Sequence, residues 1–404
     1  MSLSAPTRGL DALLSSRLRR TVTGGGLERR TDTVVLDTGS AGVWTVTLDA
    51  GRAAVRRGAA RTATLVVRTT PDLLADVVEG RVSAVQAFLD RRLTVRGDLS
   101  LALALDGLFA QDAARAPGLP RSREVAAMGV RTSYLEAGPP DAPPVLLLHG
   151  LGATNASMLT LFADLAVDHR VLAPDLPGFG ASAAPRGAYT PAWFAAWVEE
   201  FQRATGSRGT ATRGAVVVGN SLGGRIALEA GLQHPSSVRA LVLLAPSPAF
   251  RRLRQVVPFV RRVSPQLAGL PLPVSHRAVV EGIRAMLSDG SRLPQAWYDA
   301  AADEAVRVLA DRAHRVAFVA CARQIYLEDA YGFTGFWQRL PLLQPPALFV
   351  WGDRDRLVPS SFSRHVAAAL PSAEQVVLED CGHVPHLEHP QDTAAIVRRF
   401  LAQV

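Results

Sequence analysis

Residues 216–224 read V-V-V-G-N-S-L-G-G, an apolar run that stops abruptly at a serine flanked by glycines. The run predicts a strand, and the helical spacing of residues 225–232 predicts a sharp turn at Ser221. A serine hydroxyl is a poor nucleophile in water unless a base activates it and N–H groups surround the point of attack. A strained elbow exposes the hydroxyl and directs the N–H of Leu222 toward an oxyanion. The segment therefore predicts a nucleophilic serine.

Candidate partners for this serine follow later in the chain. The apolar run 347–351 is followed by Asp353 and Asp355, and the run 375–378 is followed by His383. A histidine can accept the serine proton and return it to the leaving group, while a buried carboxylate fixes the tautomer of the imidazole. Asp355 and Asp353 compete for that last role. The alternative for either one is a carboxylate that caps or solvates the turn.

Two further motifs stand upstream, namely V-L-L-L-H-G-L-G at residues 145–152 and D-L-P-G-F-G at residues 175–180. With the serine, aspartate and histidine segments, they resemble the motifs of the α/β-hydrolases and follow the family's order. The resemblance covers the chain from about residue 122 to residue 404. It implies an α/β fold with a mostly parallel sheet and a helical cap.

The same resemblance implies a role for each matched residue. Ser221 would be the nucleophile, His383 the base, and Asp355 the acid, because the family's acid stands three residues after the glycine that ends the strand. The backbone N–H of Leu151 would join that of Leu222 in the oxyanion hole. His149 would brace the oxyanion loop by hydrogen bonding.

A different chemistry is conceivable around the histidine. His386 and His389 lie close to His383 and Glu388 in sequence, and histidines with a nearby carboxylate can hold zinc. We favour the interpretation without a metal, because the triad order already accounts for His383. Glu388 and Pro390 would then start the last helix. No cofactor is expected.

Composition narrows the remaining possibilities. The 404 residues leave room for two or three domains, and 48% hydrophobic with 20% charged residues is ordinary for a globular protein. No stretch has the length of a signal peptide or a membrane span, so a cytoplasmic location is expected. Two cysteines, Cys321 and Cys381, are too few for a disulfide framework, and we expect both to be reduced.

The net charge of +8 would ordinarily suggest a nucleic-acid partner. All 44 basic residues are arginine, however, and no recognition motif accompanies them, so no nucleic-acid binding is expected. The basic segment 251–262 is predicted to be a solvated cap helix, and contact with an anionic membrane surface is the alternative. The sequence does not determine the oligomeric state.

A polar segment rich in Pro and Gly predicts a linker at 112–122 between a domain at 1–111 and one at 123–404. In the first domain, alternating residues predict strands at 33–36, 42–48, 53–56 and 63–68, and helical spacing follows at 71–79 and 82–89. This order indicates an α+β layer.

Several features of this first domain resemble the sterol carrier protein type of lipid-transfer domain. They are G-V-W at residues 42–44, T-P-D-L at 70–73 and R-L-T-V-R-G-D-L at 92–99, followed by an apolar helix. The resemblance implies a tunnel for lipids or acyl chains at residues ~14–110. The alternative is a closed core made by five apolar residues, Leu101, Leu103, Leu105, Leu108 and Phe109.

A long insertion at about 247–340 shows helical spacing at 278–287, 294–301, 304–309 and 316–325 and predicts a cap over the serine. Its aromatic residues are candidates for lining a pocket: Trp297, Tyr326, Tyr331, Phe333, Phe336 and Trp337. We expect a serine hydrolase that acts on an ester, thioester or related acyl bond of a small hydrophobic substrate or lipid. Carbon–carbon bond hydrolysis of a diketone-like aromatic degradation product is a second possibility, and a non-catalytic lipid carrier is a third.

Overall fold

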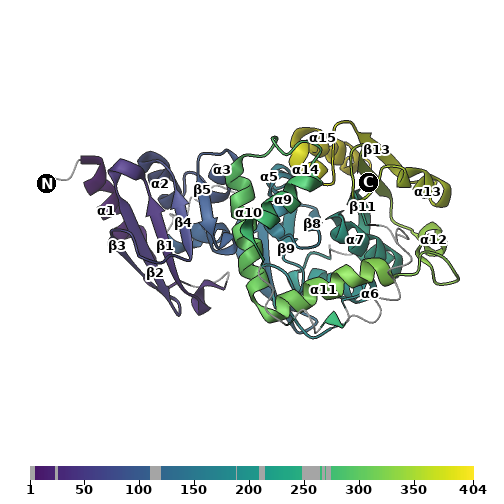
Figure 1. Cartoon of the computed structure of the whole chain (residues 1–404), viewed down its shortest axis with the longest axis horizontal. Helices are drawn as coiled ribbons and strands as arrows, with labels where there is room; N and C mark the ends of the chain where they lie inside the picture. Colours follow the sequence, from purple (N-terminus) through teal and green to yellow (C-terminus); the bar gives the residue numbers. More distant parts are fainter. Residues whose placement is uncertain are drawn as a thin grey trace.

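The computed structural model describes residues 5–22, 26–109, 120–187, 189–208, 214–247, 264–265, 269 and 274–404. It places an N-terminal and a C-terminal domain next to each other along the long axis of the molecule (Figure 1). Most of the predicted linker and the whole basic segment 251–262 lie outside the described residues. Among the helices described, none is long and apolar enough to cross a membrane.

The sheet of the N-terminal domain has the strand order β3-β2-β1-β4-β5. Strand β1 pairs in parallel with β4, whereas the other neighbours are antiparallel. The alternating residues Val34, Leu36 and Val46 are buried on one face, which is why the period-2 pattern predicted β1 to β4. Strand β5 was not predicted. The strands are β1 (Thr31–Asp37), β2 (Val43–Asp49), β3 (Arg52–Arg57), β4 (Leu65–Arg68) and β5 (Thr94–Gly97).

Short helices cover this sheet, and three of them start at side-chain caps. Thr70, Ser83 and Asp98 each accept a backbone N–H from the first turn that follows. The helices are α1 (Ala5–Arg17), α2 (Pro71–Val78), α3 (Ala84–Leu89) and α4 (Leu99–Leu103), with a 3-10 turn at Leu105–Leu108. Helix α1 is not anticipated by the sequence analysis; it buries Leu10 and Leu14 against the sheet.

The C-terminal domain contains an eight-stranded sheet in the order β13-β12-β11-β10-β8-β9-β7-β6. The pairs β6/β7 and β7/β9 are antiparallel and all others are parallel, so the mostly parallel sheet is confirmed. The central strands are buried on both faces, which explains their continuous apolar runs. They are β6 (Arg121–Ala127), β7 (Val130–Ala137), β8 (Pro144–Leu148), β9 (Arg170–Pro174), β10 (Ala215–Asn220), β11 (Val238–Leu244), β12 (Ala347–Gly352) and β13 (Glu374–Leu378).

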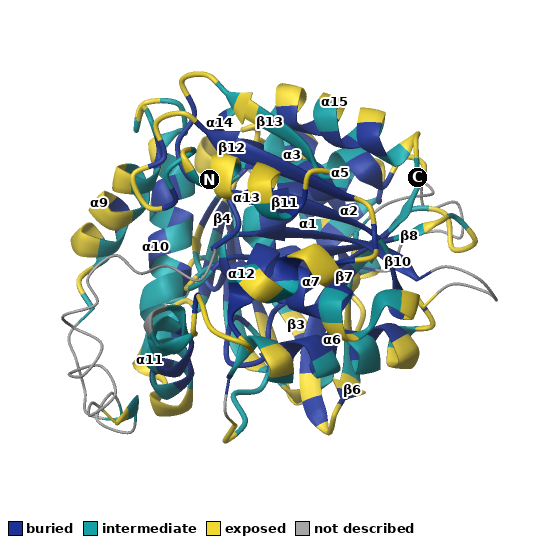
Figure 2. Ribbon diagram, turned by 90° about the vertical axis from the view of Figure 1, so that its right-hand side faces the viewer, coloured by how far each residue is buried: buried dark blue, intermediate teal, exposed yellow. Residues whose placement is uncertain are grey.

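Helices cover both faces of this sheet, and their outer sides are exposed (Figure 2). Helices α5 (Leu159–Leu165) and α15 (Pro390–Leu401) share one apolar cluster with one face. The opposite face packs against α6 (Pro191–Thr205), α7 (Leu222–Gln233), α12 (Phe336–Arg339) and α13 (Phe362–Ala369).

The cap contains α9 (His276–Met286), α10 (Gln295–Ala310) and α11 (Arg312–Leu327). The expected separate segments 294–301 and 304–309 form one continuous helix, α10. Residues 301–303 read A-A-D and contain no glycine or proline, so nothing interrupts the helix there.

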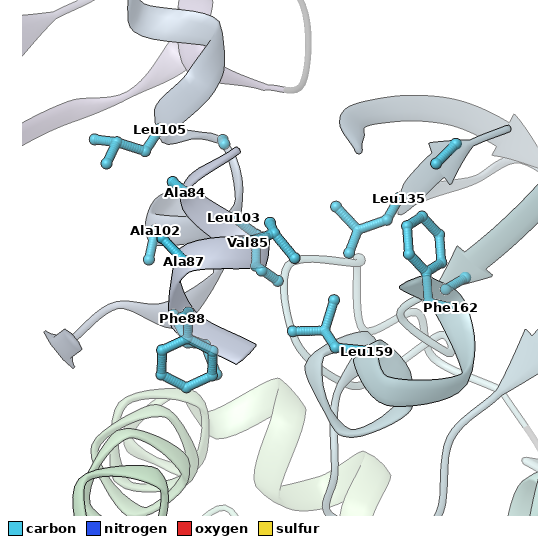
Figure 3. Packing of buried hydrophobic residues seen from close by; sticks show 14 of the residues in the cluster. Ala84, Val85, Ala87, Phe88, Ala102, Leu103, Leu105, Leu135, Leu159 and Phe162 are labelled. Carbon is cyan, nitrogen blue, oxygen red and sulfur yellow. The ribbon is translucent and has the colours of Figure 1, made fainter. Parts of the chain in front are cut away.

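The two domains share one apolar core cluster. Val85 and Leu103 of the N-terminal domain face Leu135, Leu159 and Phe162 of the C-terminal domain (Figure 3). Burial of apolar surface is the main favourable term in folding. The junction between the domains is therefore a packed interface over these residues.

Candidate active site

Ser221 lies at the apex between β10 and α7 and is partly exposed. Its backbone has φ +52° and ψ −112°, a conformation that side-chain-bearing residues rarely adopt. The turn is tight enough that a Cβ at Gly223 would lie 2.2 Å from the carbonyl oxygen of Leu148. Glycine is thus needed at position 223, because its backbone approaches that of Leu148 closely. The elbow has the geometry that the sequence predicts.

Asp355 and His383 are in direct contact. Asp355 Oδ2 lies 2.7 Å from His383 Nδ1, and both residues are buried. The other oxygen, Oδ1, accepts the N–H groups of Leu357 and Val358, each at 2.8 Å. The carboxylate is therefore fixed on three sides. Its bond to Nδ1 leaves Nε2 of the imidazole as the nitrogen that can act as a base.

Asp353, the competing aspartate, has a different partner. Its Oδ1 accepts the N–H of Cys381 at 3.1 Å, two residues before His383. It therefore supports the loop that carries the histidine.

Asn220, the residue before the serine, joins the elbow to the histidine loop. Its Nδ2 donates to the carbonyl oxygens of Leu244, at 3.0 Å, and of His383, at 3.1 Å. Asn220 is not among the predicted site residues, although it lies within the serine motif. The bond brings the chain segments of Ser221 and His383 together at the carboxyl ends of β10 and β11.

The loop after β8 lies against the serine. A Cβ at Gly150 would lie 3.4 Å from Cβ of Ser221, which places the neighbouring Leu151 beside the elbow. Leu222 is the first residue of α7, so its N–H has no carbonyl partner within the helix. A Cβ at Gly152 would lie 2.9 Å from the ring of Phe318, so α11 covers this loop. Nothing in the sequence singles out Phe318.

His149 is fully buried, and both of its ring nitrogens contact backbone groups. Nε2 accepts the N–H of Leu176 at 2.9 Å, so the proton lies on Nδ1, which donates to the carbonyl oxygen of Gly150 at 2.8 Å. Burial lowers the pKa of His149 from 6.5 to about 4. A neutral imidazole with both nitrogens engaged braces the loop and is not a candidate base.

Glu388 has a different place from the one expected. Helix α15 begins at Pro390 as predicted, but Glu388 ends the short helix α14 (Pro385–Glu388). Its Oε1 accepts the N–H of Gly382 at 2.9 Å, and its Oε2 accepts the N–H of Ser288, in the cap, at 2.7 Å. Glu388 therefore joins the histidine loop to the segment that follows α9. No local sequence pattern reveals this link, because Ser288 and Glu388 are 100 residues apart.

The other two histidines of this segment have separate surroundings. His386 is fully buried, while His389 Nε2 lies 3.1 Å from the carbonyl oxygen of Asp380. Within the described parts of the chain, no group of three or more His, Cys, Asp or Glu side chains is arranged to hold a metal ion. Cys321 and Cys381 are both free and buried.

The aromatic residues proposed for a pocket lining occupy different environments. Trp297 stacks on Phe88 of the N-terminal domain, with ring centroids 5.5 Å apart. Phe336 is buried in the core, whereas Phe333 is fully exposed and Tyr331 is about half exposed. Trp337 stacks on Phe362 of α13, and the side chain of Tyr326 lies outside the described residues.

The apolar stretch that ends the N-terminal domain is packed inside it. Its members all belong to the core cluster and are at most 8% exposed: Leu101, Leu103, Leu105, Leu108 and Phe109. These five side chains are therefore part of the packed interior of the domain.

Comparison with known proteins agrees with this architecture. The profile of the "alpha/beta hydrolase fold" family matches residues 143–390, and that of the "SCP-2 sterol transfer family" matches residues 25–110. The chain is 28% identical over 289 residues to a 2-hydroxy-6-oxo-6-(2'-aminophenyl)hexa-2,4-dienoic acid hydrolase of Metapseudomonas resinovorans, covering 70% of this chain and 91% of the relative. It is 30% identical over 267 residues to a pimeloyl-[acyl-carrier protein] methyl ester esterase of Aromatoleum aromaticum, covering 63% of this chain and 96% of the relative.

Among solved structures, a membrane phospholipase A described as a bacterial virulence factor superposes with a TM-score of 0.57. It shares 27% sequence identity, and the match covers 70% of this chain and 86% of that one. The alpha/beta hydrolase profile alone spans more than half of the chain. The protein belongs to the alpha/beta hydrolase fold family, and an SCP-2 sterol transfer domain precedes its hydrolase domain.

Proposed function

We propose that the protein is a serine hydrolase that cleaves an ester, thioester or related acyl bond of a hydrophobic substrate. The observation that carries this proposal is the geometry of three residues: Ser221 at a strained apex and the buried, hydrogen-bonded pair Asp355–His383. Asn220, which precedes Ser221, donates to the backbone oxygen of His383 and so joins the two parts. A serine, an oriented imidazole and a fixed carboxylate are the groups that acyl transfer requires.

The steps follow from these positions. Ser221 Oγ attacks the carbonyl carbon while His383 Nε2 takes its proton, and the imidazolium is stabilised by Asp355. The N–H groups of Leu151 and Leu222 hold the negative charge that develops on the carbonyl oxygen. The proton on His383 then passes to the alcohol or thiol that leaves, and an acyl-serine forms. Water attacks this acyl-serine with the same base, which releases the acid and restores Ser221.

The proposed substrate class rests on the relatives and on the family of the first domain. One relative is named as a methyl ester esterase, and one structural neighbour is named as a phospholipase. The SCP-2 match adds a domain whose family name indicates sterol transfer. We therefore propose that the N-terminal domain binds a lipid and that the hydrolase half acts on a lipid-like acyl substrate.

Carbon–carbon bond hydrolysis is the second candidate, and the comparisons support it specifically. Two relatives, at 28% and 29% identity, carry names of this class: the dienoic acid hydrolase above and a 2-hydroxymuconate semialdehyde hydrolase of Pseudomonas putida. The same three residues would serve this reaction on an activated diketone-like substrate.

Labelling with a fluorophosphonate probe tests the proposal most directly. The full-length protein should be labelled at one site, and Ser221→Ala should abolish the labelling. A series of p-nitrophenyl esters of increasing chain length would then be compared with a ring-cleavage product that carries a vinylogous diketone. Faster turnover of the diketone than of every ester would replace the first candidate with the second. If nothing labels and nothing is turned over, the non-catalytic lipid carrier is the better account.

A further inference from the structure

Helix α10 of the cap lies between strand β5 of the N-terminal domain and the rest of the C-terminal domain (Figure 1). Asp303 on this helix makes three bonds across the junction. Its Oδ2 accepts the N–H of Gly97 at 2.9 Å and Nε of Arg96 at 2.7 Å, and its Oδ1 accepts Nη2 of Arg96 at 3.2 Å. A bidentate pair of this kind fixes direction as well as distance.

Glu304, the next residue, reaches the start of α4. It is 3% exposed, and its Oε2 accepts the N–H of Leu99 at 3.0 Å. Arg307, one turn later, donates to both oxygens of Glu304 and lies 3.6 Å from Asp98 Oδ2. A buried carboxylate must keep such partners, because removing one leaves an uncompensated charge. The N-terminal domain thus supplies one of the donors to this buried carboxylate, the N–H of Leu99, and Arg307 of α10 supplies the others.

Apolar contacts support the same junction. Phe88 of α3 and Trp297 of α10 stack with an interplanar angle of 13°. Figure 3 shows Phe88 at the edge of the shared core cluster, next to the helices of the cap. The position of α10 is therefore set by polar bonds at Asp303 and Glu304 and by stacking near its first turn.

Helix α10 in turn holds α9. A small apolar cluster joins the two helices through Val280, Leu287, Tyr298 and Ala302, each at most 5% exposed. The hydroxyl of Tyr298 also donates to the carbonyl oxygen of Gly290, at 2.8 Å, in the segment after α9.

The end of α9 reaches the histidine loop. The N–H of His383 donates to the carbonyl oxygen of Met286 at 2.8 Å. Ser288 Oγ and the N–H of Gly382 both donate to Glu388, at 2.8 and 2.9 Å. A Cβ at Gly382 would lie 2.4 Å from the oxygen of Met286, so the two segments meet with no spare room.

We propose that the N-terminal domain positions His383 through the cap. The corner of β5 and α4 holds α10, α10 holds α9, and the end of α9 holds the backbone of the histidine loop. The inference rests on the proposed function only in that His383 serves as the base. In this arrangement Asp303 and Glu304 are positioning residues, and the N-terminal domain sets the rate of the chemical step as well as any lipid binding.

The test removes the Arg96–Asp303 pair at the junction and compares it with a matched pair elsewhere. The same change also removes two longer contacts, that of Arg96 with Asp299 at 3.8 Å and that of Asp303 with His276 of α9 at 3.3 Å. The variant Arg96→Ala/Asp303→Ala deletes the contact, whereas Arg68→Ala/Asp37→Ala deletes an arginine–aspartate pair of the same sheet that lies within the N-terminal domain. In both pairs the aspartate also accepts the N–H of a glycine. Neither pair lies in the core, so both full-length variants should fold.

Hydrogen–deuterium exchange gives the first readout and needs no enzyme activity. In the junction variant the N–H groups of Gly97 and Leu99 should exchange faster, and those of Gly382 and His383 should follow. The control pair should leave all four unchanged. Faster exchange at Gly97 and Leu99 with unchanged exchange at Gly382 and His383 would overturn the proposal, and so would unchanged exchange at all four.

Turnover of a short soluble ester gives the second readout. We expect kcat of the junction variant to fall by roughly ten-fold or more with KM little changed, because small misplacements of a catalytic group are costly. A rise in KM alone would instead indicate a change in the pocket and would contradict the proposal. If wild-type protein is not labelled by a fluorophosphonate, the proposed function fails, while the exchange data still decide the mechanical link.

Discussion

Asn220 Nδ2 donates to the carbonyl oxygen of His383 over 3.1 Å, so the residue before the serine is bonded directly to the residue that carries the imidazole. The same amide nitrogen also donates to Leu244 at the end of β11. One buried side chain thus connects the elbow, a neighbouring strand end and the histidine loop. The spacing of Ser221 and His383 is therefore set by this bond from the Asn220 side chain to the His383 backbone, as well as by any bond between the serine and histidine side chains.

Asn220→Ala should therefore separate catalysis from folding. It leaves the carbonyl oxygen of His383 without its donor, whereas that of Leu244 still accepts the N–H of Ser221 at 3.0 Å. The lost bonds should lower the free energy of unfolding by about 1–2 kcal/mol. The histidine loop loses its tie to the elbow, and kcat should fall by about ten-fold or more. Urea unfolding and steady-state kinetics on a short ester would measure both effects. Unchanged kcat would show that the bond does not position His383.

Ser221→Ala should leave a folded protein with almost no activity. The change removes one partly exposed hydroxyl and creates no core cavity, so the unfolding midpoint should stay close to that of the wild type. Hydrolysis should fall on the order of a million-fold, as for other triad nucleophiles. Circular dichroism and ester turnover provide the measurements. A variant that keeps most of its activity would rule out Ser221 as the nucleophile.

The two aspartates should differ strongly. Asp355→Asn keeps the shape but can place an N–H opposite Nδ1 of His383, which favours the wrong tautomer and should lower kcat by roughly ten thousand-fold. Asp353→Asn should cost little, because an amide oxygen can still accept the N–H of Cys381. Measuring kcat for both variants on one substrate decides between them. The reverse ranking would transfer the role of the acid to Asp353.

The buried neutral His149 should make the fold sensitive to acid. Its pKa is lowered to about 4 by burial, whereas in the unfolded chain it is near 6.5. Between these values the unfolded chain binds a proton that the folded protein does not. Its contribution to the free energy of unfolding is therefore complete above pH 6.5 and decreases as the pH falls toward 4, by about 3 kcal/mol in all.

Comparison with His149→Gln isolates this contribution. The variant should lose about one proton's worth of slope in a plot of unfolding free energy against pH between 4 and 6.5. Asp175 affects the free energy of unfolding in the opposite direction. Burial raises its pKa to about 7, so below that pH the folded protein holds a proton that the unfolded chain releases. The difference between wild type and variant removes that background. Identical slopes would mean that His149 is protonated in the folded protein.

The sequence by itself determined the elements whose signals are local. The apolar runs of β10 and β12 specify buried strands, and the glycines around Ser221 specify a sharp turn, with little help from the rest of the chain. The alternating strands and the capped helices of the N-terminal domain could be predicted for the same reason. The α/β fold, the mixed first domain and the assignment of each to a family followed from these patterns.

Only the tertiary structure decided the relations between distant segments. Glu388 was predicted to start a helix, yet its oxygens accept the N–H groups of Gly382 and Ser288. No local pattern encodes the second contact, because Ser288 lies 100 residues away. Which of Asp353 and Asp355 contacts His383 is likewise visible only in the structure, because both aspartates follow the same strand. The hydrogen bonds of Asp303 and Glu304 to Gly97 and Leu99 of the N-terminal domain also join segments that are distant in the sequence. Hydrophobic periodicity reports which face of an element is buried, but the partner of that face is fixed only when the whole chain packs.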